Sequence, residues 1–399
     1  MQTMGVGIIG FGFMGKVHAC NYRSVSVYYD PVPVQTKLVG VADAIPEVAQ
    51  HAVEQAGFEF STTDWRELVA RDDIQIIDIC SPNSLHAEQL LAAMASGKHI
   101  YCDKPLVVSE GDMARVGAAL RVYRGVGQMA FQYRFFPATL RAKQLIDEGF
   151  IGSVISFRAA YLHSGSVDKS KPMGWKQLKS EGGGVLQDLG SHIVDLMNHL
   201  IGPFASVFTQ TCILYPERPN LQGKMVPVEA DDMMVMMAKL SNGTIGAIEA
   251  SKIATGTEDE LRFEIHGEQG ALRFNSMDPN YLEAYDLRAP ESPLGGGRGW
   301  CKIACVQRYG KPGGFPGPKF SIGWIRAHMH SLYNFLEAIA SGKQPEPSLQ
   351  QGLYQQRVLA VAEKSASSQT WQSLPSAEFR SSESIHPTAG GRAGSPTPS

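Results

Sequence analysis

Six consecutive residues near the start of the chain restrict its fold more than any other feature. They follow the short apolar run Val6–Ile9 directly, and they are Gly10, Phe11, Gly12, Phe13, Met14 and Gly15. The next residues, Lys16–Tyr22, have helical spacing. A G-x-G-x-x-G sequence between a strand and a helix is typical of a dinucleotide site, because the N-terminus of the helix directs free N–H groups at the phosphates.

The three glycines have separate roles in such a site. Gly10 permits the tight turn, Gly12 lets the backbone approach a pyrophosphate, and Gly15 allows the helix to pack closely. The same pattern requires an acid at the end of the second strand, where it binds ribose hydroxyls. Asp43 closes the apolar run 38–42 and meets this requirement. Because its carboxylate would repel a 2′-phosphate, the sequence favours NAD over NADP as the cofactor.

The spacing of Asp43 departs from the usual pattern. Asp43 lies farther beyond the glycines than the roughly 20 residues that are common. An insertion around residues 25–35 explains this excess. The alternative is that Asp43 is a solvated side chain that only caps the predicted helix 45–56.

Strand and helix signals alternate through the first 136 residues. The strongly β-branched run Ile74–Cys80 predicts a buried strand, and the Ala- and Leu-rich run Ser84–Ser96 predicts the helix after it. Such alternation indicates a parallel sheet with helices on both faces. We therefore expect an α/β Rossmann domain at residues 1–136.

After residue 137, β-rich segments predominate. These segments are 154–162, 207–214, 233–240, 244–251, 261–266 and 271–274, and predicted helices at 137–149, 181–200, 325–341 and 352–365 accompany them. The pattern predicts an α+β domain with a large, mostly antiparallel sheet at residues 137–375. Residues 289–323, rich in Gly and Pro, are expected to form a long surface loop, for which a place over the active site is one option. Residues 376–399, rich in Ser, Pro, Gly and Thr, are expected to be a disordered tail.

The composition excludes several kinds of partner. Charge is nearly balanced, at 36 Lys and Arg against 39 Asp and Glu, so we expect no nucleic-acid surface. No apolar run is long enough to span a bilayer, and no basic region precedes a long apolar run at the N-terminus, so we expect neither a membrane contact nor a secretion signal. The 6 cysteines are scattered without a C-x-x-C pair. This predicts reduced thiols in a cytoplasmic protein and no metal site.

Two motifs carry candidate catalytic groups. Asp188 and His192 are four residues apart, so on a helix their side chains share a face. Lys104, which follows the predicted strand 99–102, lies where open α/β sheets bind ligands. A group that accepts a proton, beside a cofactor that accepts hydride, is what alcohol oxidation requires. Taken singly, Asp188 and His192 also fit the polar face of an amphipathic helix, and Lys104 also fits a surface turn.

Several motifs in one order resemble those of a known family. They are Gly10–Gly15, Ser81-Pro82-Asn83 with His86, Asp103-Lys104-Pro105, and Gly182–His192. From Met4 to about Leu374, the chain resembles the glucose–fructose oxidoreductase, inositol dehydrogenase and MocA family. Asp103 differs from the Glu that many members have at this position. The segments with partial similarity to the levoglucosan dehydrogenase branch of that family are Phe13–His18, Asp64–Arg66 and Tyr215–Pro219.

The resemblance implies NAD(P) in the first domain, with its nicotinamide facing the sheet of the second domain. The expected cofactor contacts are the glycine motif, Asp43, Ser81, Pro82, Asn83, His86, Asp103 and Lys104. The resemblance also places Lys104, Asp188 and His192 around the reactive hydroxyl of the substrate. Members often associate through their sheets, so we expect a homodimer or homotetramer.

The same resemblance implies a role for each catalytic side chain. His192 accepts the hydroxyl proton as general base, because an unperturbed imidazole titrates near neutrality. Lys104 donates to the same oxygen and stabilises its developing negative charge. Asp188 orients the substrate and the imidazole. We therefore predict an NAD-dependent oxidoreductase that acts on a secondary hydroxyl of a sugar, anhydrosugar or cyclitol.

Further residues are candidates for binding the substrate. They are Tyr133, Arg134, Trp175, Lys176 and His328. Tyr133 and Arg134 follow the last predicted Rossmann strand, and the aromatic face of Trp175 would suit the apolar face of a pyranose. For each of them, an ordinary packing or surface role is an equally good explanation.

Two other functions fit this sequence. A glycosidase of the same fold would retain NAD, oxidise C3 of a sugar transiently, eliminate the aglycone and reduce the sugar again. A non-catalytic NAD-binding sensor is the third option, but a sensor has no need of an acid–base group such as His192. The sequence does not separate the dehydrogenase from the glycosidase, since Lys104, Asp188 and His192 would serve both reactions.

Overall fold

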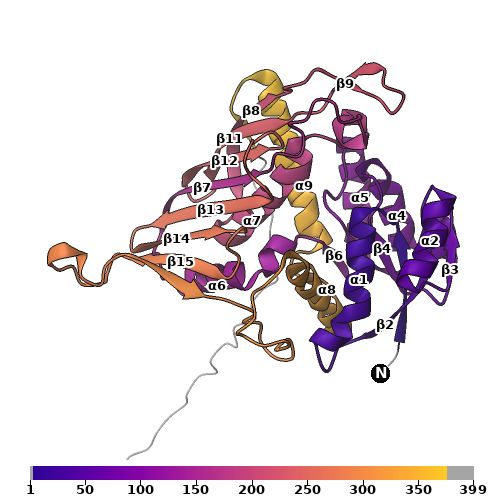
Figure 1. The fold of residues 1–399 in the computed structure, drawn as a ribbon, viewed down its shortest axis with the longest axis horizontal. Coiled ribbons are helices and arrows are strands. Elements are labelled where there is room, and N and C mark those ends of the chain that lie inside the picture. The colour runs from indigo at the N-terminus through magenta and orange to yellow at the C-terminus, as the bar shows by residue number, and fades with distance from the viewer. Residues whose placement is uncertain (1–2, 375–399) are drawn as a thin grey trace, which may run out of the picture.

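The structure, a computed structural model, describes residues 3–374 in two domains that lie side by side (Figure 1). The predicted tail at 376–399 lies outside the described residues. The first domain holds a parallel sheet and the second holds a larger, mostly antiparallel sheet, which confirms the predicted fold class. No helix in the described part of the chain is long and apolar enough to cross a membrane.

The first domain is built on a six-stranded parallel sheet with the strand order β3-β2-β1-β4-β5-β6. Its strands are β1 (Thr3–Ile9), β2 (Gln35–Ala42), β3 (Phe60–Thr62), β4 (Ile76–Ile79), β5 (His99–Cys102) and β6 (Gly127–Met129). Its helices are α1 (Phe13–Tyr28), α2 (Pro46–Ala56), α3 (Trp65–Ala70), α4 (His86–Ala95) and α5 (Glu110–Val122). The strand order reverses between β1 and β4, so the crevice at their carboxyl ends is where a sheet of this kind binds its ligand.

The central strands of this sheet are apolar because helices cover both of its faces. Ile8 on β1 and Ile76 and Ile79 on β4 have no exposed surface. Asp78 is the polar exception on β4. Its carboxylate is fully buried and pairs with Nδ1 of His18 on α1 at 2.9 Å, which gives the buried charge a partner.

The second domain is built on a nine-stranded sheet with the order β16-β15-β14-β13-β7-β12-β11-β8-β17. Its strands are β7 (Val154–Leu162), β8 (Phe204–Cys212), β11 (Met233–Leu240), β12 (Ile245–Ser251), β13 (Glu260–Gly267), β14 (Gly270–Asn275), β15 (Tyr281–Asp286), β16 (Trp300–Ala304) and β17 (Gln372–Ser373), with the separate hairpin β9 (Glu217–Pro219) and β10 (Met225–Pro227). Among the described strands of this sheet, only β7 and β12 pair in parallel. Helices α6 (Pro137–Asp147), α7 (Ser191–Ile201) and α9 (Leu349–Ser368) pack against it.

The prediction that residues 289–323 form one long surface loop is only partly correct. They contain β16, which pairs with β15 at the edge of the large sheet. The sequence did not indicate this strand, because it is short and Gly- and Pro-rich segments flank it. An edge strand pairs with only one neighbour and can form from a few residues of high β-propensity. Farther along, the segment packs on the first domain, where Phe315 meets Tyr28 edge-on with ring centres 5.4 Å apart. The connection between β15 and β16 projects from the sheet (Figure 1).

Helix α8 (Trp324–Ser341) lies within the range predicted for the second domain, but it packs in the first. Leu332, Phe335 and Leu336 are buried in the same apolar core as the central strand β1. Tyr101 on β5 donates a hydrogen bond to Oγ of Ser331 at 2.8 Å. The periodicity of α8 shows that the helix has an apolar face, but it does not show which core that face joins.

The predicted helix 181–200 is divided in the structure. A π-helical turn, Leu186–Gly190, precedes α7. Gly182 and Gly184 have φ of 72° and 105°, in the left-handed region, so a regular right-handed helix cannot begin at residue 181.

Helix α7 is buried on nearly all sides, rather than amphipathic with a polar face in solvent. Asp195 on this helix is 2% exposed, and its carboxylate binds the guanidinium of Arg134 through two hydrogen bonds, of 2.7 Å from Nε and 2.6 Å from Nη2. Arg134 therefore fixes α7 against the segment that follows β6. This pair gives Arg134 a structural role, and its substrate contact stays a prediction.

Breaking this ion pair is expected to destabilise the protein. The Asp195→Ala variant leaves the guanidinium of Arg134 buried without a counter-charge, which costs about 3–5 kcal/mol. We expect a clearly lower midpoint of thermal unfolding, measured by scanning calorimetry. The double variant Arg134→Met/Asp195→Leu removes both charges and should recover most of the loss. A double variant as unstable as the single one would show that the unpaired charge is not the cause.

Candidate active site

The glycine loop between β1 and α1 has the shape of a dinucleotide cradle. Gly10 has φ of 91°, and a Cβ there would lie 2.7 Å from the carbonyl oxygen of Cys80. A Cβ on Gly15 would lie 2.1 Å from the carbonyl oxygen of Gly10, so α1 can approach the loop only with a glycine at this position. A Cβ on Gly12 would meet no atom within 4 Å. The backbone at Gly12 therefore borders open space, as the approach of a pyrophosphate requires.

Asp43 stands directly beside this loop. Its Oδ2 accepts the backbone N–H of Phe11 at 2.8 Å, and its Oδ1 accepts that of Ile45 at 3.0 Å. The N-cap residue of helix α2 is Ile45 rather than Asp43. The long spacing before Asp43 comes from the length of α1 and from a connection whose Tyr29 is buried and stacks on Tyr333 of α8. The carboxylate therefore lies against the glycine loop, and its contact with ribose hydroxyls stays a prediction.

His86 connects the loops that follow β4 and β5. Its Nδ1 lies 2.8 Å from the carbonyl oxygen of Pro105, and its Nε2 lies 3.0 Å from that of Ser81. The ring is fully buried, and burial lowers the pKa of His86. His86 is therefore committed to holding the two loops together. Ser81 donates its hydroxyl to Oε1 of Gln89 at 2.7 Å, which fixes the first of these loops further.

Asn83 joins the two domains in the same region. Its Nδ2 donates to the carbonyl oxygen of Gly182 at 2.9 Å. Gly182 begins the glycine-rich segment that leads to Asp188. The loop after β4 and the catalytic segment of the second domain are therefore held in register.

Lys104 and Asp188 meet across the domain boundary. Nζ of Lys104 lies 2.5 Å from Oδ1 of Asp188 and donates to its carbonyl oxygen at 2.9 Å. The other carboxylate oxygen, Oδ2, lies 3.1 Å from Nζ of Lys176 and 3.1 Å from Nζ of Lys252. Three ammonium groups thus contact one carboxylate.

Lys252 was missed by the sequence analysis. It directly follows β12, which runs parallel to β7, and the carboxyl ends of parallel strands meet at one edge of a sheet. That position was the available signal. The Lys252 side chain is 6% exposed, whereas that of Lys176 is 51% exposed. Lys252 therefore belongs to the floor of the site and Lys176 to its mouth.

These contacts set the protonation states in the site. Burial raises the pKa of Asp188, but Lys104, Lys252 and Lys176 more than offset this effect and hold the pKa well below its usual range. Burial lowers the pKa of Lys252. Burial and the charge of Lys104 also hold the pKa of His192 well below its usual range. At neutral pH, Asp188 is therefore ionised and His192 is neutral.

An aromatic cage surrounds the ring of His192. The ring centre of His192 lies 6.0 Å from that of Phe131, 5.2 Å from that of Tyr133 and 5.7 Å from that of Tyr161, all in edge-on contacts. Its Nδ1 is buried and has no hydrogen-bond partner among the described residues. Both oxygens of Asp188 contact lysines, and the aromatic cage packs around the imidazole; the expected orientation of His192 by Asp188 stays a prediction.

The two tyrosines of the cage are themselves fixed by hydrogen bonds. Tyr133 donates to the hydroxyl of Tyr161 at 2.9 Å, and Tyr161 donates to Oδ1 of Asp259 at 2.6 Å. Tyr133 therefore supports His192, and Tyr161 and Asp259 are further residues that the sequence analysis missed. Their positions on β7 and just before β13 gave no motif.

The remaining candidates lie around this centre. Trp175 is 36% exposed, and Nζ of Lys176 lies 5.7 Å from the centre of its ring. His328 is buried on α8, with its ring centre 4.1 Å from that of Trp324, and both of its ring nitrogens lack a partner among the described residues. The structure brings Lys104, Lys176 and Asp188 into direct contact. For Trp175 and His328, substrate contact stays a prediction.

Two family models match consecutive ranges of the chain. The model described as an oxidoreductase family with an NAD-binding Rossmann fold matches residues 4–130, and the model of the GFO/IDH/MocA C-terminal domain matches residues 139–273. The chain belongs to the GFO/IDH/MocA family. This result confirms the resemblance drawn from the sequence motifs.

Several members of the GFO/IDH/MocA family match nearly the whole chain. Levoglucosan dehydrogenase from Pseudarthrobacter phenanthrenivorans is 34% identical, over 94% of this chain and 99% of that protein. A solved structure of levoglucosan dehydrogenase with NADH and levoglucosan has a TM-score of 0.89 at 34% identity, and covers 94% of this chain and 100% of its own. Inositol 2-dehydrogenase from Rhizobium meliloti is 28% identical, over 88% of this chain and 93% of that protein. A 2,7-anhydro-N-acetylneuraminate hydratase from Escherichia coli is 25% identical, over 85% of this chain and 87% of that protein.

This GFO/IDH/MocA protein is thus an NAD-dependent oxidoreductase of the sugar and polyol dehydrogenase type. The open space at Gly12 and the carboxylate of Asp43 beside the glycine loop fit an NAD cofactor. The roles of individual side chains in this GFO/IDH/MocA site remain predictions.

Removing the carboxylate of Asp43 is expected to change the cofactor preference. The Asp43→Ala variant removes a charged acceptor for the hydrogen bonds that the ribose hydroxyls are expected to donate. Each such bond contributes about 1.5–3 kcal/mol, so NADH should bind at least about tenfold more weakly. The preference for NADH over NADPH should fall at the same time, because the repulsion of a 2′-phosphate is gone. Titration of the reduced cofactors, followed by their fluorescence, measures both dissociation constants. Asp64→Ala, which removes the acid that caps α3, is the matched control. An unchanged preference in Asp43→Ala would place the ribose contact elsewhere.

Proposed function

We propose that this enzyme transfers hydride between nicotinamide and a secondary hydroxyl of a sugar, anhydrosugar or cyclitol, with His192 as the acid–base group. The observation that carries this proposal is the contact of Lys104 with Asp188, at 2.5 Å, next to a neutral and buried imidazole. NAD, when bound, supplies the hydride acceptor. The side chains then need only to remove a proton and stabilise charge on one oxygen.

His192 is suited to accept the hydroxyl proton. Its low pKa keeps the ring unprotonated at neutral pH, so the ring is ready to act as a base. A weakly basic imidazole requires a substrate hydroxyl that is more acidic than an ordinary alcohol. Lys104 meets that requirement when it donates to the same oxygen, because its charge favours the alkoxide form. In the reverse direction, the protonated ring of His192 returns the proton to a ketone.

Lys104 has a hydrogen-bond donor left for the substrate. An ammonium group carries three N–H donors. Two of those on Lys104 are directed to the carboxylate and to the carbonyl oxygen of Asp188. Asp188 thus fixes the position of the ammonium, and the third N–H is available to the reactive oxygen.

The substrate class rests on the relatives and on the mouth of the site. The names of the matching dehydrogenases specify levoglucosan and inositol, which are an anhydrosugar and a cyclitol. The half-exposed ring of Trp175 offers an apolar face beside the charged centre. We also propose that the enzyme is cytoplasmic. The cysteines of the described residues form no disulfide, as is usual in that reducing compartment.

An elimination reaction is the second candidate function. The 25% identical hydratase shows that relatives with similar domains are named for reactions other than net oxidation. A glycosidase that retains NAD and oxidises C3 transiently would use Lys104, Asp188 and His192 in the same way. Its lysines would stabilise the negative charge that builds up as the aglycone leaves.

A substrate screen separates the two candidates. Purified protein is mixed with NAD and then with NADP, and tested against glucose, glucosides, levoglucosan and inositols for the absorbance of reduced nicotinamide. Net reduction with NAD supports the dehydrogenase. Release of an aglycone from an aryl glycoside without net reduction, by protein that retains NAD, supports the elimination reaction.

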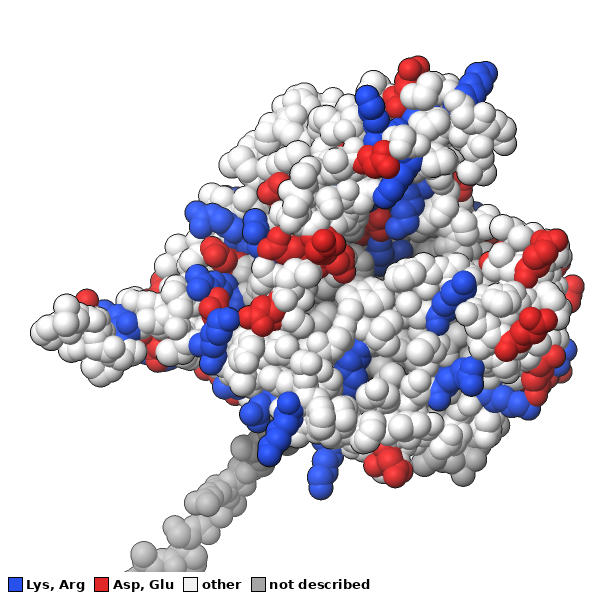
Figure 2. All heavy atoms as spheres, in the orientation of Figure 1, with Lys and Arg blue, Asp and Glu red and all other residues white. Residues whose placement is uncertain are grey.

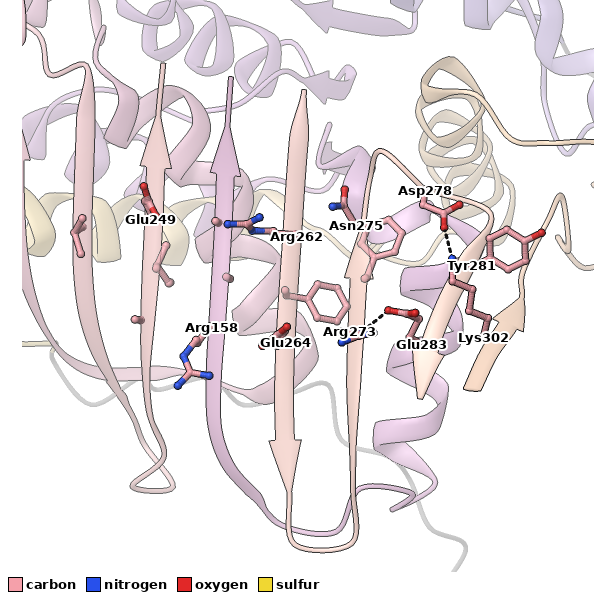
Figure 3. Close-up of a pocket in the computed structure, with 17 residues that line it drawn as sticks. Arg158, Glu249, Arg262, Glu264, Arg273, Asn275, Asp278, Tyr281, Glu283 and Lys302 are labelled. Atoms are coloured by element: carbon pink, nitrogen blue, oxygen red, sulfur yellow. Dashed lines mark hydrogen bonds and ion pairs between the residues drawn. The ribbon is translucent and has the colours of Figure 1, made fainter. Parts of the chain in front are cut away.

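We further propose that the open face of the large sheet binds a second copy of this chain. Figure 3 shows this face, which carries both apolar side chains and charged side chains that form ion pairs. Val235 and Met237 on β11, together with Ile245 on β12, are exposed there. Arg273 on β14 pairs with Glu283 on β15, and Lys302 pairs with Asp278 at 2.9 Å. A face with both signs of charge and an apolar end is self-complementary about a two-fold axis, which suits a homodimer and, by further association, a homotetramer.

Replacing His192 is expected to abolish turnover while leaving the cofactor bound. The His192→Ala variant loses the only proposed base, so kcat should fall by at least about 100-fold, the range that a general base contributes. The dissociation constant of NADH should stay within about twofold. In the wild type, the acid limb of the kcat/KM profile should lie well below pH 6.5, because the ring becomes protonated only below its lowered pKa. Surviving turnover in His192→Ala would show that another group is the base.

Disrupting the open sheet face is expected to produce monomers. The variant Val235→Glu/Met237→Glu places two negative charges in the apolar part of the proposed interface, where they would have to be desolvated. Size-exclusion chromatography with light scattering should give the mass of at least two chains for the wild type and one chain for the variant. Leu221→Glu, at an exposed apolar position between β9 and β10, is the control and should not dissociate. A wild type that has the mass of one chain would contradict this proposal.

A further inference from the structure

The cluster around Asp188 contains more positive charge than its carboxylate can balance. Lys104, Lys176 and Lys252 all lie within 3.1 Å of the Asp188 oxygens. Lys176 and Lys252 share a single oxygen, Oδ2. A second anion would therefore be bound favourably at this position.

Two neighbouring acids of the second domain are engaged elsewhere. Asp188 raises the pKa of Lys176, and Asp103 of the first domain raises it further through its charge, without an ion pair among the described residues. Oδ2 of Asp231 accepts the backbone N–H of Leu186 at 2.9 Å, and burial raises the pKa of Asp231. Asp259 accepts the hydroxyl groups of Tyr161 and Tyr133, at 2.6 Å and 3.2 Å. Within residues 3–374, neither carboxylate forms an ion pair with a lysine of the cluster. The excess charge is thus not removed by either acid through direct contact.

The lysines also have unused donors. The Lys252 ammonium is directed to Oδ2 of Asp188 and, at 3.4 Å, to the carbonyl oxygen of Gly184. The Lys176 ammonium contacts Oδ2 and lies over the ring of Trp175. Each ammonium has three N–H groups, so N–H donors remain on both. Lys252 is buried and shares its one carboxylate with Lys104 and Lys176, whose like charges oppose its own, so a second anion beside it would stabilise its charge further.

The position of the cluster links this charge to the substrate. Lys104 comes from the first domain, whereas Lys176, Asp188 and Lys252 come from the second, so the cluster lies where the domains meet. The space-filling view shows a hollow between the domains where blue basic and red acidic side chains gather (Figure 2). A sugar held on the face of Trp175 would place its substituents near Lys176.

Given the proposed dehydrogenase function, on which this depends, we infer that the preferred substrate is an anionic sugar whose charged group binds Lys176 and Lys252. The charged group is a carboxylate, as in an aldonic or uronic acid, or a phosphate ester. Both offer several acceptor oxygens to ammonium donors. The reacting hydroxyl then lies between Lys104 and His192, while the anion occupies the far side of Asp188. A neutral sugar would leave the two lysines without this partner.

The test compares acidic sugars with neutral sugars of the same carbon skeleton. Turnover with NAD is measured for glucose, glucuronate, gluconate and glucose 6-phosphate, and for galactose with galacturonate. We expect kcat/KM at least tenfold higher for an acidic member than for its neutral partner, mainly through KM. This ratio should fall as NaCl is raised from 0.05 to 0.5 M, because salt screens the attraction. The carboxylate and phosphate arms identify which anion is preferred.

Variants show whether the two lysines cause the preference. Lys176→Met and Lys252→Met should each reduce the acidic-to-neutral ratio at least fivefold, and Lys176→Glu should reverse it. Lys176→Arg keeps the charge and should keep the ratio. Lys169→Met, which alters an exposed lysine of the same loop, is the matched control and should not change it. A thermal shift with NADH plus gluconate, but not glucose, provides a binding readout without turnover.

The outcomes separate this inference from the function on which it rests. Neutral sugars that react as well as or better than their acidic partners would overturn the inference and leave the dehydrogenase intact. An equal loss of kcat/KM for both members of a pair in Lys176→Met and Lys252→Met would show a merely structural role and would also overturn it. Absence of reduced nicotinamide with every sugar would instead contradict the dehydrogenase.

Discussion

The two domains depend on one ionised carboxylate. Asp188 lies in a π-helical turn of the second domain and holds the ammonium of Lys104 from the first. It can remain charged while buried because two further lysines contact its other oxygen. The loops on both sides of the site converge on this group, since Asn83 fixes the glycine segment that leads to Asp188. The two domains are therefore joined at this point by an electrostatic contact as well as by apolar packing.

The sequence predicted the parts of the site whose backbone geometry requires particular residues. Gly10 and Gly15 can be recognised because a side chain at either position would collide with the loop itself. Asp43 can be recognised because it must end the second strand. The β-branched run of β4 indicates burial on both faces of a parallel sheet. In each case the requirement is local, so a short stretch of sequence contains it.

The sequence could not predict contacts that depend on distant segments meeting. Lys252 looks like an ordinary lysine after a strand until β12 is paired with β7. Arg134 and Asp195 are 61 residues apart, and neither position shows that the other neutralises it. The aromatic cage of His192 likewise comes from segments around Phe131 and Tyr161. Side chains of this kind acquire their roles only from the topology, which hydrophobic periodicity does not specify.

The return of α8 to the first domain has a consequence for the order in which the protein is made. Leu332, Phe335 and Leu336 complete the core around β1, yet they are synthesised after eight of the nine strands of the large sheet, β7 to β16. A nascent chain that ends after β6 therefore has its glycine loop but exposes the apolar surface that α8 will cover. Domains generally fold as units from the N-terminus during synthesis. Here the core of the nucleotide-binding domain is closed only after residues 324–341 have left the ribosome.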